Sequence, residues 1–420
     1  MAVSEQNWQE VKLGDLAEYV TVGYVGPMAH EYLSSGIPFL RSQDIKPYRI
    51  DVSDITYISE TFHEKIKKSA LQPGDVVIVR TGRPGTSAVI PESLSVANCS
   101  DMVIVRPGQN LDSRFLCYYI NSIAQDHVSA YSVGAVQQHY NVGSAKELKI
   151  LLPPLPEQQA IARILGALDD KIELNRRMNH TLEEMARALF KSWFVDFDPV
   201  TAKAEGRVPY GMNAETAFLF PAEFEETDEG VIPKGWKIGT VGEVFDLTMG
   251  QSPPGETYNE VGEGIAFYQG RTDFGVRYPT PRIYCTTPTR YANPGDTLVS
   301  VRAPVGDINM ANEKCSIGRG LAAVRHKSGS RSFTYYSMLF LKEEFDVFEG
   351  EGTLFGSISG DGFRNIKTVI PSPEIISEFE QKVYSIDQTI ENNESQIKSL
   401  ASIRNALLPK LMSGEVRVKG

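Results

Sequence analysis

The sequence predicts an α/β (α+β) fold: two similar mixed α/β domains, separated by two long helices that form an antiparallel coiled coil with approximate two-fold symmetry. Three observations predict this architecture. The chain of 420 residues contains an internal repeat. Each copy ends in a long segment with helical periodicity. The part before that segment contains short β-branched runs between turn residues.

The repeat is visible in four stretches of sequence. The tract 152–189 resembles the tract 370–407 at a constant offset of 218 residues. The other three pairs, first copy and then second, are 8–23 and 236–250, 37–41 and 265–269, and 73–80 and 294–302. The predicted boundaries are 1–152 for the first domain, 153–197 for its helix, 198–230 for a linker, 231–370 for the second domain and 371–414 for its helix.

Three runs rich in β-branched residues predict strands inside the domains. They are 75–80, 102–106 and 297–301, and Pro-Gly or Gly-x-Pro turns bound them. In the Pro-Gly-Asp turns, the glycine supplies the backbone angles that a tight turn needs. These features indicate a fold class and not a function.

The two long segments predict helices that pair along an apolar seam. Apolar residues recur at alternating steps of four and three, the period of a coiled coil. The predicted seam is Ile161, Leu165, Leu168, Ile172, Asn175, Leu182 and Leu189 in the first helix, and Val383, Ile386, Ile390, Asn393, Ile397, Leu400 and Leu407 in the second. Prolines before each segment suit helix starts. Because each helix alone would expose its stripe, we expect the two to pack on each other.

Asn175 and Asn393 occupy equivalent positions in the two seams. A buried amide demands a partner, so the pair would fix the register of the helices. The alternative is that both amides face solvent at a loose point of the seam. At about 1.5 Å per residue, a helix of about 38 residues spans roughly 57 Å and would be a stiff spacer between two domains.

Composition predicts a cytoplasmic globular protein without a metal site. The hydrophobic and charged fractions of 41% and 23% are those of a soluble chain. No apolar run reaches the ~18 residues of a membrane span, and the N-terminal stretch lacks the basic head and apolar core of a signal peptide. The four cysteines form no C-x-x-C pair and the six histidines are scattered, so neither zinc nor a disulfide framework is expected.

The net charge of −11 argues at first against nucleic-acid binding, because phosphate contacts need Lys and Arg. The distribution of charge changes this view. Residues 265–330 contain 9 basic and 4 acidic side chains, whereas 200–264 contain 4 basic and 12 acidic. Residues 41–110, with 9 basic and 8 acidic, decide nothing. A charged stretch is also an ordinary solvated face, so the imbalance is compatible with DNA binding without establishing it.

The first helix and its flanks carry a family resemblance. LPPLPEQQAIARIL (152–165), followed by LDDKIELN (168–175), resembles the central region of Type I restriction–modification specificity subunits, and LFKSWFVDF (189–197) fits the same pattern. IDQTIENN (386–393) and LLPKLMSG (407–414) match more loosely in the second copy. The order of domain, helix, domain and helix extends the resemblance to the whole chain.

The resemblance implies what the two domains and their partners do. The domains would be target-recognition domains, each reading one half of a bipartite, asymmetric site in double-stranded DNA, with a spacer set by the helices. Two modification subunits would methylate adenine with S-adenosylmethionine. Restriction subunits would translocate and cut DNA with ATP and magnesium. This chain would hold no cofactor of its own and would have no membrane partner.

Base reading needs side chains that make two hydrogen bonds to one base: Arg or Lys for guanine, Asn or Gln for adenine. We expect them on loops near strand ends. The first-domain candidates are Arg41, Gln43, Lys46, Arg80, Arg83, Gln137 and Gln138, with His139 and Tyr140 beside them. The second-domain candidates are Gln269, Arg271, Arg302 and Arg319, with Phe274 as a wedge or stacking group. Arg49 and Arg277 are assigned to phosphates, which position without specifying. For each residue the alternative is an ordinary surface side chain.

Motifs for catalysis are missing. The sequences SPPG (252–255) and LPPL (152–155) lack the aromatic residue of the Asp/Asn-Pro-Pro-aromatic motif of adenine methyltransferases, which stacks on a flipped base. There is no G-x-x-x-x-G-K-[ST] phosphate loop. The sequence thus favours a non-catalytic DNA-specificity subunit. A coiled-coil scaffold that binds protein rather than DNA is the alternative, and an enzyme with its chemistry in one repeat is the third hypothesis.

Overall fold

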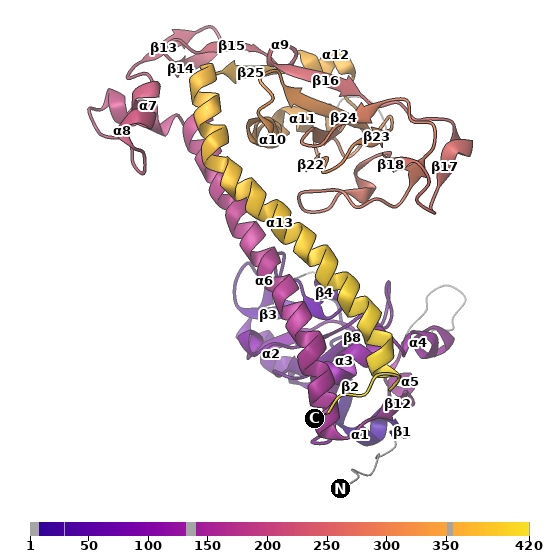
Figure 1. Ribbon diagram of the computed structural model, residues 1–420. Coiled ribbons are helices and arrows are strands. Elements are labelled where there is room, and N and C mark those ends of the chain that lie inside the picture. The colour runs from indigo at the N-terminus through magenta and orange to yellow at the C-terminus, as the bar shows by residue number, and fades with distance from the viewer. Residues whose placement is uncertain (1–7, 29, 132–139, 351–355, 420) are drawn as a thin grey trace. The chain divides into compact units, whose positions relative to one another are not determined.

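The computed structural model describes residues 8–28, 30–131, 140–350 and 356–419. The chain divides into two compact units (Figure 1). The first consists of Met1–Arg176 together with Glu394–Gly420, and the second is Arg177–Asn393. Two forty-residue helices, α6 (Leu155–Phe194) and α13 (Pro373–Met412), are each divided between the units. The predicted α/β (α+β) class with two similar domains and two long helices is confirmed.

The first unit contains two four-stranded sheets and two short strand pairs. One sheet has the antiparallel order β2-β11-β8-β9, and the other has the order β6-β3-β10-β7, in which β3 and β10 are parallel. The strands are β1 (Gln9–Lys12), β2 (Ala17–Val22), β3 (Ile37–Leu40), β4 (Ile45–Lys46), β5 (Arg49–Ile50), β6 (Thr56–Ile58), β7 (Ala70–Leu71), β8 (Val76–Val79), β9 (Ser87–Val89), β10 (Ala97–Cys99), β11 (Met102–Pro107) and β12 (Lys149–Leu152). Pairs β1–β12 and β4–β5 complete the unit.

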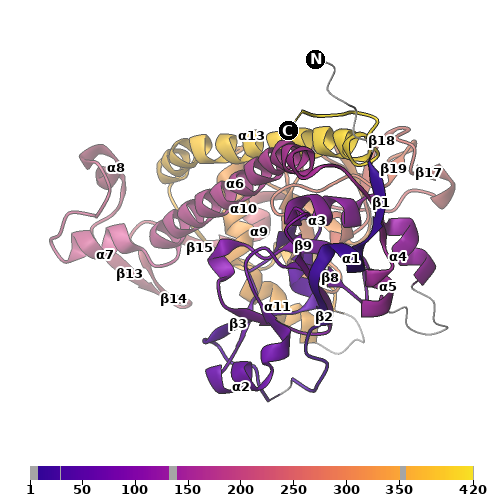
Figure 2. The same cartoon turned by 90° about the horizontal axis from the view of Figure 1, so that it is seen from below.

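Short helices connect and cover these strands. They are α1 (Leu13–Leu16), α2 (Glu60–Lys65), α3 (Ser113–Asn121), α4 (Gln125–Tyr131) and α5 (Val142–Lys146), with 3-10 turns η1 (Ser42–Asp44), η2 (Lys67–Ser69) and η3 (Glu92–Leu94). Helix α3 packs against β8 and β9 (Figure 2). Asp112 caps α3 by accepting a hydrogen bond from the backbone of Phe115 at 2.9 Å.

The second unit repeats this plan with an extra strand and an extra subdomain. Its sheets have the orders β16-β24-β21-β22 and β17-β19-β18-β23-β20, with β18 and β23 parallel, and β15–β25 and β13–β14 form pairs. The strands are β13 (Phe224–Thr227), β14 (Gly230–Pro233), β15 (Lys237–Thr240), β16 (Phe245–Met249), β17 (Tyr258–Asn259), β18 (Ile265–Tyr268), β19 (Tyr284–Cys285), β20 (Tyr291–Ala292), β21 (Thr297–Ser300), β22 (Ile308–Met310), β23 (Cys315–Ile317), β24 (Leu321–His326) and β25 (Lys367–Ile370).

The second unit also contains short helices. They are α7 (Asp198–Ala204), α8 (Ala214–Leu219), α9 (Val241–Val244), α10 (Arg331–Phe340), α11 (Lys342–Gly350) and α12 (Gly360–Arg364), with turns η4 (Gly255–Thr257) and η5 (Arg271–Asp273). The segment expected to be a linker, 198–230, contains α7, α8 and β13. It is therefore a structured part of the second unit.

The repeat in sequence is a repeat in structure. The Pro-Gly-Asp turns precede β8 in one unit and β21 in the other. Asp75 accepts two hydrogen bonds from Arg106 on β11, at 2.8 and 2.9 Å, and Asp296 accepts one from Arg325 on β24, at 2.5 Å. In both units the turn is thus tied by a charged hydrogen bond to the neighbouring central strand.

Each unit builds its core partly from the two long helices. The core of the first unit joins Phe115 of α3 to Leu165 of α6 and to Leu408 and Met412 of α13. The core of the second joins Phe190 of α6 to a set of aromatic residues that includes Phe379 of α13, at a ring-centre distance of 5.5 Å. The helices therefore belong to the domain cores and do more than link them.

The two helices pair antiparallel in each unit. In the first, Asn175 of α6 donates a hydrogen bond to Gln396 of α13 at 3.2 Å, while Asp169 of α6 binds Arg404 at 2.6 Å. From the first contact to the second, the residue number falls on α6, from 175 to 169, and rises on α13, from 396 to 404, so the two helices run antiparallel. All fourteen predicted seam residues are buried or half-buried. Asn175 and Asn393 are both buried, which excludes the solvent-facing alternative, and the amide partner of Asn393 is Asn179 rather than Asn175.

Candidate nucleic-acid interface

Three loops of the second unit meet at one edge of its sheets. Because β18 and β23 are parallel, the loops after them leave at the same edge. The backbone N–H of Gly320 donates to the carbonyl of Gln269 at 3.1 Å, and the N–H of Val301, just after β21, donates to the carbonyl of Gly320 at 2.9 Å. These bonds bring together Gln269, Arg302 and Arg319, which were predicted from separate parts of the sequence.

The side chains at this edge are exposed and mostly cationic. Gln269, Arg271, Arg302 and Arg319 are all exposed. Arg271 forms an ion pair with Asp307. Within the described ranges, Arg302 and Arg319 form no ion pair with a carboxylate. Guanidinium groups that no acid neutralises are free to bind phosphates or guanine edges.

Arg290 belongs to the same edge and was missed by sequence reasoning. Its carbonyl accepts a hydrogen bond from Ile317, the last residue of β23, at 3.1 Å, and its side chain is exposed. The basic excess of residues 265–330 includes Arg290, but only the pairing of β20 with β23 shows that it lies near Arg319. We define the reading edge of the second unit as Gln269, Arg290, Arg302 and Arg319.

Arg277 is not a surface phosphate contact. Only 1% of the residue is exposed, and it binds Glu183 and Asp387 on the two long helices. Burial is the largest effect and opposes its positive charge, but Asp387, together with Tyr335, Tyr336 and Glu183, outweighs burial and raises the pKa of Arg277. The sequence could not show this, because the two acids lie 94 and 110 residues away.

Phe274 is held against the protein. Its side chain is half-buried and packs on the small apolar cluster that contains Tyr268, Leu298 and Leu321. In this position its ring does not project as a wedge. A stacking role would require the loop after η5 to move.

Three of the four predicted first-unit arginines, Arg41, Arg49 and Arg80, are neutralised by neighbouring acids. Arg41 donates to Asp44 at 3.1 and 2.9 Å and also pairs with Asp54 at 3.2 Å. The hydrogen bond with Asp44 is the main reason that the pKa of Arg41 is raised. Arg80 pairs with Asp101, and Arg49 lies 3.8 Å from Asp51.

The remaining first-unit candidates divide by exposure. Gln43 and Arg83 are exposed and Lys46 is half-buried. Tyr140 is fully buried in the core, where its carbonyl accepts from the Arg80 side chain at 3.1 Å and its backbone N–H donates to the Arg80 carbonyl at 3.2 Å. The prediction that the Tyr140 side chain lies on the DNA surface is therefore wrong. Gln137, Gln138 and His139 lie outside the described residues.

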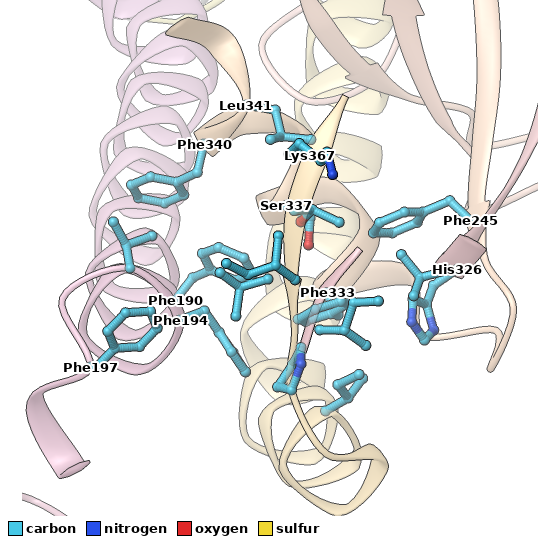
Figure 3. A pocket seen from close by; sticks show the side chains of 18 of the residues that line it. Phe190, Phe194, Phe197, Phe245, His326, Phe333, Ser337, Phe340, Leu341 and Lys367 are labelled. Atoms are coloured by element: carbon cyan, nitrogen blue, oxygen red, sulfur yellow. The ribbon is translucent and has the colours of Figure 1, made fainter. Parts of the chain in front are cut away.

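A pocket of about 340 Å³ lies in the second unit between the end of α6, helix α10 and strand β25 (Figure 3). Its wall includes Phe190, Phe194 and Phe333, with Ser337 facing the strand. None of the candidate DNA contacts lines it. In the first unit, Tyr119 stands at the position equivalent to Ser337, and its hydroxyl group bonds the backbone of Lys149 and Leu151 at 3.3 and 3.2 Å.

In the described ranges, no group of three or more His, Cys, Asp and Glu side chains is arranged to hold a metal ion. No helix among the described residues is both long and apolar enough to cross a membrane. The four cysteines are buried free thiols.

Comparison with known proteins gives one consistent family. A family model described as the Type I restriction modification DNA specificity domain matches residues 5–184 and 233–401. The chain is 28% identical over 428 residues to the putative type I restriction enzyme MjaX specificity subunit of Methanocaldococcus jannaschii, covering 99% of this chain and 95% of that one. It is 26% identical over 475 residues to the type I restriction enzyme HindI specificity subunit of Haemophilus influenzae, covering 98% and 100%.

The fold also matches a solved structure. The crystal structure of the Type-I restriction-modification system S subunit from M. genitalium is similar, with a TM-score of 0.59 at 16% identity, covering 98% of this chain and 97% of that one. At this identity the likeness concerns the fold alone.

Proposed function

This chain belongs to the family of Type I restriction–modification DNA specificity subunits, and from this premise we propose that each of its two units reads one half of an interrupted, asymmetric DNA site. The observation that carries the proposal is that the same strand order occurs twice, with different side chains at equivalent loops. Arg41 follows β3 where Gln269 follows β18. Two similar readers with different contacts suit a site whose halves differ in sequence.

The reading edge of the second unit supports base recognition. Arg302 and Arg319 are long, exposed cations with the planar donors that guanine accepts, and Gln269 offers the amide that adenine requires. In the first unit, Gln43 and Arg83 are exposed, whereas Arg41 and Arg80 would first have to leave Asp44 and Asp101. We therefore expect the first half-site to rely on fewer charged contacts.

The helices α6 and α13 set the spacer between the two half-sites in this proposal. Each has forty residues, and a helix rises about 1.5 Å per residue, so each is roughly 60 Å long. Both are packed into domain cores at their ends, so they cannot pivot freely on the domains. A stiff connection of fixed length favours one spacer over others.

The same helices dock two modification subunits. Helix α6 exposes apolar side chains outside its seam: Ile164 and Leu174 in the first unit, and Met185 in the second, are 40%, 56% and 56% exposed. Ile164 and Leu174 lie ten residues apart, close to three turns of a coiled-coil helix, and so share one side of α6 within the first unit. A row of this kind suits packing by helices of a partner. Restriction subunits join the complex in the same proposal.

This chain is non-catalytic in the proposed complex. Its sequence lacks the motifs that bind a flipped adenine or a nucleotide triphosphate. We assign S-adenosylmethionine to the modification subunits and ATP with magnesium to the restriction subunits. Purified without partners, the chain should bind DNA and catalyse nothing. Methylation by the purified chain alone would contradict this assignment.

The deciding experiment is single-molecule sequencing of adenine methylation in the native host, with and without this gene. Loss of one interrupted two-part motif on deletion is the expected result, and it would also identify the target. Persistence of every such motif would show that the chain does not direct methylation.

The alternative function is a coiled-coil scaffold without DNA specificity, which the exposed apolar row on α6 would also serve. Salt dependence separates the two. Affinity for the target should fall steeply as salt rises, with a slope of about −0.9 per neutralised phosphate. A scaffold would show no preference for the target duplex over a scrambled one at any salt concentration.

A further inference from the structure

Arg277 joins the loop between β18 and β19 to both long helices of the second unit. Its guanidinium donates to both carboxylate oxygens of Glu183 on α6, at 2.9 and 2.8 Å, and to Asp387 on α13 at 2.7 Å. The guanidinium also lies 3.7 Å from the ring centre of Tyr335 and bonds the Tyr336 hydroxyl at 3.1 Å. A cation on a recognition-domain loop is thus buried between one acid from each helix.

The first unit has a cluster at the same place, but there a helix supplies the cation. Asp169 on α6 accepts from Arg404 on α13 at 2.6 Å and from the Tyr118 hydroxyl at 2.6 Å. The loop residue is Tyr48, between β4 and β5, whose neutral ring lies 4.5 Å from the Arg404 guanidinium and 5.2 Å from the Tyr118 ring. The recognition-domain loop therefore meets the helices in both units.

The two clusters correspond residue by residue at the repeat offset of 218. The corresponding helix pairs, first unit and then second, are Asp169 and Asp387, Arg404 and Ala186, and Ala401 and Glu183. At these three pairs of positions the first unit's helices carry one acid and one base, whereas the second unit's helices carry two acids and no base.

The loop residue complements the helices in each unit. Tyr48 adds no charge where the helices are already balanced, and Arg277 adds a cation where they are not. Exchanging these contacts would be unfavourable. Tyr48 in the second unit would leave Glu183 and Asp387 without a cation, and Arg277 in the first would be placed against Arg404. Buried charges without a partner, or beside a like charge, destabilise a fold strongly.

The anchor cluster is defined as Arg277, Glu183 and Asp387 in the second unit and as Tyr48, Asp169 and Arg404 in the first. We propose that the anchor cluster matches each recognition domain to its own position on the helix pair, and that Arg277 is the positioning residue of the second domain. The loop that carries Arg277 begins at η5, next to Gln269 of the reading edge. Fixing Arg277 between the helices therefore fixes where this loop starts relative to them. The role of this loop in DNA recognition rests on the proposed function, whereas the charge complementarity of the cluster does not.

A rescue series tests the proposal. Arg277→Met removes the cation and leaves both acids. The triple variant R277M, E183A, A186R gives the second unit the helix charges of the first, with one acid and one base. Lys234→Met is the matched control, since Lys234 is an exposed cation of the same unit, paired with Glu223 on the β13–β14 hairpin. Each variant is produced with its modification subunits, and methylation of the native motif is measured by sequencing.

We expect R277M to lower methylation of the native motif at least tenfold and to relax the second half-site. Methylation of sites with a mismatched second half should rise relative to methylation of matched sites, while discrimination at the first half stays unchanged. The triple variant should restore both quantities to within about threefold of wild type. Simple unfolding would lower all methylation without changing the ratio between matched and mismatched sites.

Either of two results would overturn the proposal: R277M behaving like K234M, or the triple variant doing no better than R277M. Thermal unfolding of the purified chain follows the same series, and the triple variant should recover most of the midpoint that R277M loses. If wild type methylates no interrupted motif, the proposed function fails, and the unfolding series still decides whether the charges are matched.

A transplant gives the reciprocal test. Placing the second recognition domain on the first position should yield a methylated motif only when the helices also carry R404A and A401E, which remove the opposing cation and supply the missing acid. Equal activity of the transplant without those two changes would show that the cluster does not match domains to positions.

Discussion

Asn393 of α13 donates its side-chain amide to the side-chain oxygen of Asn179 on α6 at 2.8 Å, and both residues are 4% exposed. An amide buried in an apolar seam is stable only while it keeps its partner, so the pair favours one register of the helices.

The first prediction concerns this pair. Asn393→Leu leaves Asn179 buried without that partner and should lower the free energy of unfolding by about 1–3 kcal/mol. The double variant N179L, N393L removes both amides and should recover part or all of the loss. Chemical denaturation of the three chains measures the difference. A double variant less stable than N393L would contradict the pairing argument.

Exposed arginines of the second unit should discriminate the second half-site. Arg302→Ala should weaken binding to the matched duplex by ~1–3 kcal/mol if the contact is bidentate to guanine, and Arg271→Ala should do the same. Arg271 must leave Asp307 to bind, so its effect should be the smaller one. Titrations with duplexes altered in one half-site provide the measurement, with K234A as control. An equal loss at first-half variants would assign these residues to nonspecific phosphate binding.

Helix length should set the spacer. Inserting seven residues into α6 after Arg176 and seven into α13 after Asn393 preserves the coiled-coil phase and adds about 10 Å to each helix. At roughly 3.4 Å per base pair, the preferred spacer should grow by about three base pairs. Sequencing of the methylated motif in cells gives the answer directly. An unchanged spacer would show that the length of the helices does not set the spacer.

Stability of the first unit should depend on pH through Glu157. Burial raises the pKa of this carboxyl, but hydrogen bonds from Arg417 and Trp8, at 2.7 and 3.1 Å, prevail and lower it. The ionised form therefore stabilises the fold above the unfolded pKa of about 4.3, and this contribution disappears as pH falls through the folded value.

Accordingly, Glu157→Gln should be less stable than wild type at pH 7, by about 1 kcal/mol, because Arg417 is partly exposed. This difference in the free energy of unfolding between wild type and Glu157→Gln should shrink on acidification below about pH 4. Thermal unfolding of both chains between pH 3 and 7 tests this. A gap that stays constant with pH would mean that the ion pair contributes nothing measurable.

The pocket beside β25 should accept a tyrosine. Ser337→Tyr places in the second unit the side chain that Tyr119 supplies in the first, where its hydroxyl bonds the strand backbone. Filling the cavity should stabilise the chain by about 0.5–2 kcal/mol. Ser337→Phe, which lacks the hydroxyl, is the matched control and should gain less. A loss of stability in both variants would show that the pocket is too narrow for the ring.

Periodicity and repeats were sufficient to predict the larger features of the fold. The helix at 155–194 and its partner at 373–412 lie within the predicted segments because the seam pattern is long and regular. The segment 198–230 was expected to be a linker, but it contains α7, α8 and β13, which cover the end of α6 in the second unit. Such short elements carry too few periodic residues to be distinguished from a loop.

Individual contact residues were harder to predict for a physical reason. An arginine in a turn-rich segment reads the same in the sequence whether it faces solvent, as Arg302 does, or two acids about a hundred residues away, as Arg277 does. Likewise nothing near Tyr140 reveals its burial. Local sequence predicts where strands end and turns begin, whereas the exposure of a side chain depends on which distant segments pack against it.

Division of the long helices between the units has a consequence for biosynthesis. The second unit is complete once residue 393 has been made, whereas the first still lacks Leu408, Leu411 and Met412 of its core and the Arg417 partner of Glu157. A nascent chain folds from its N-terminus as residues emerge, yet here the domain synthesised first closes last. During translation the first domain therefore keeps part of its hydrophobic core uncovered until residues 408–412 have been made, and termination before them would release a chain whose first domain is incomplete.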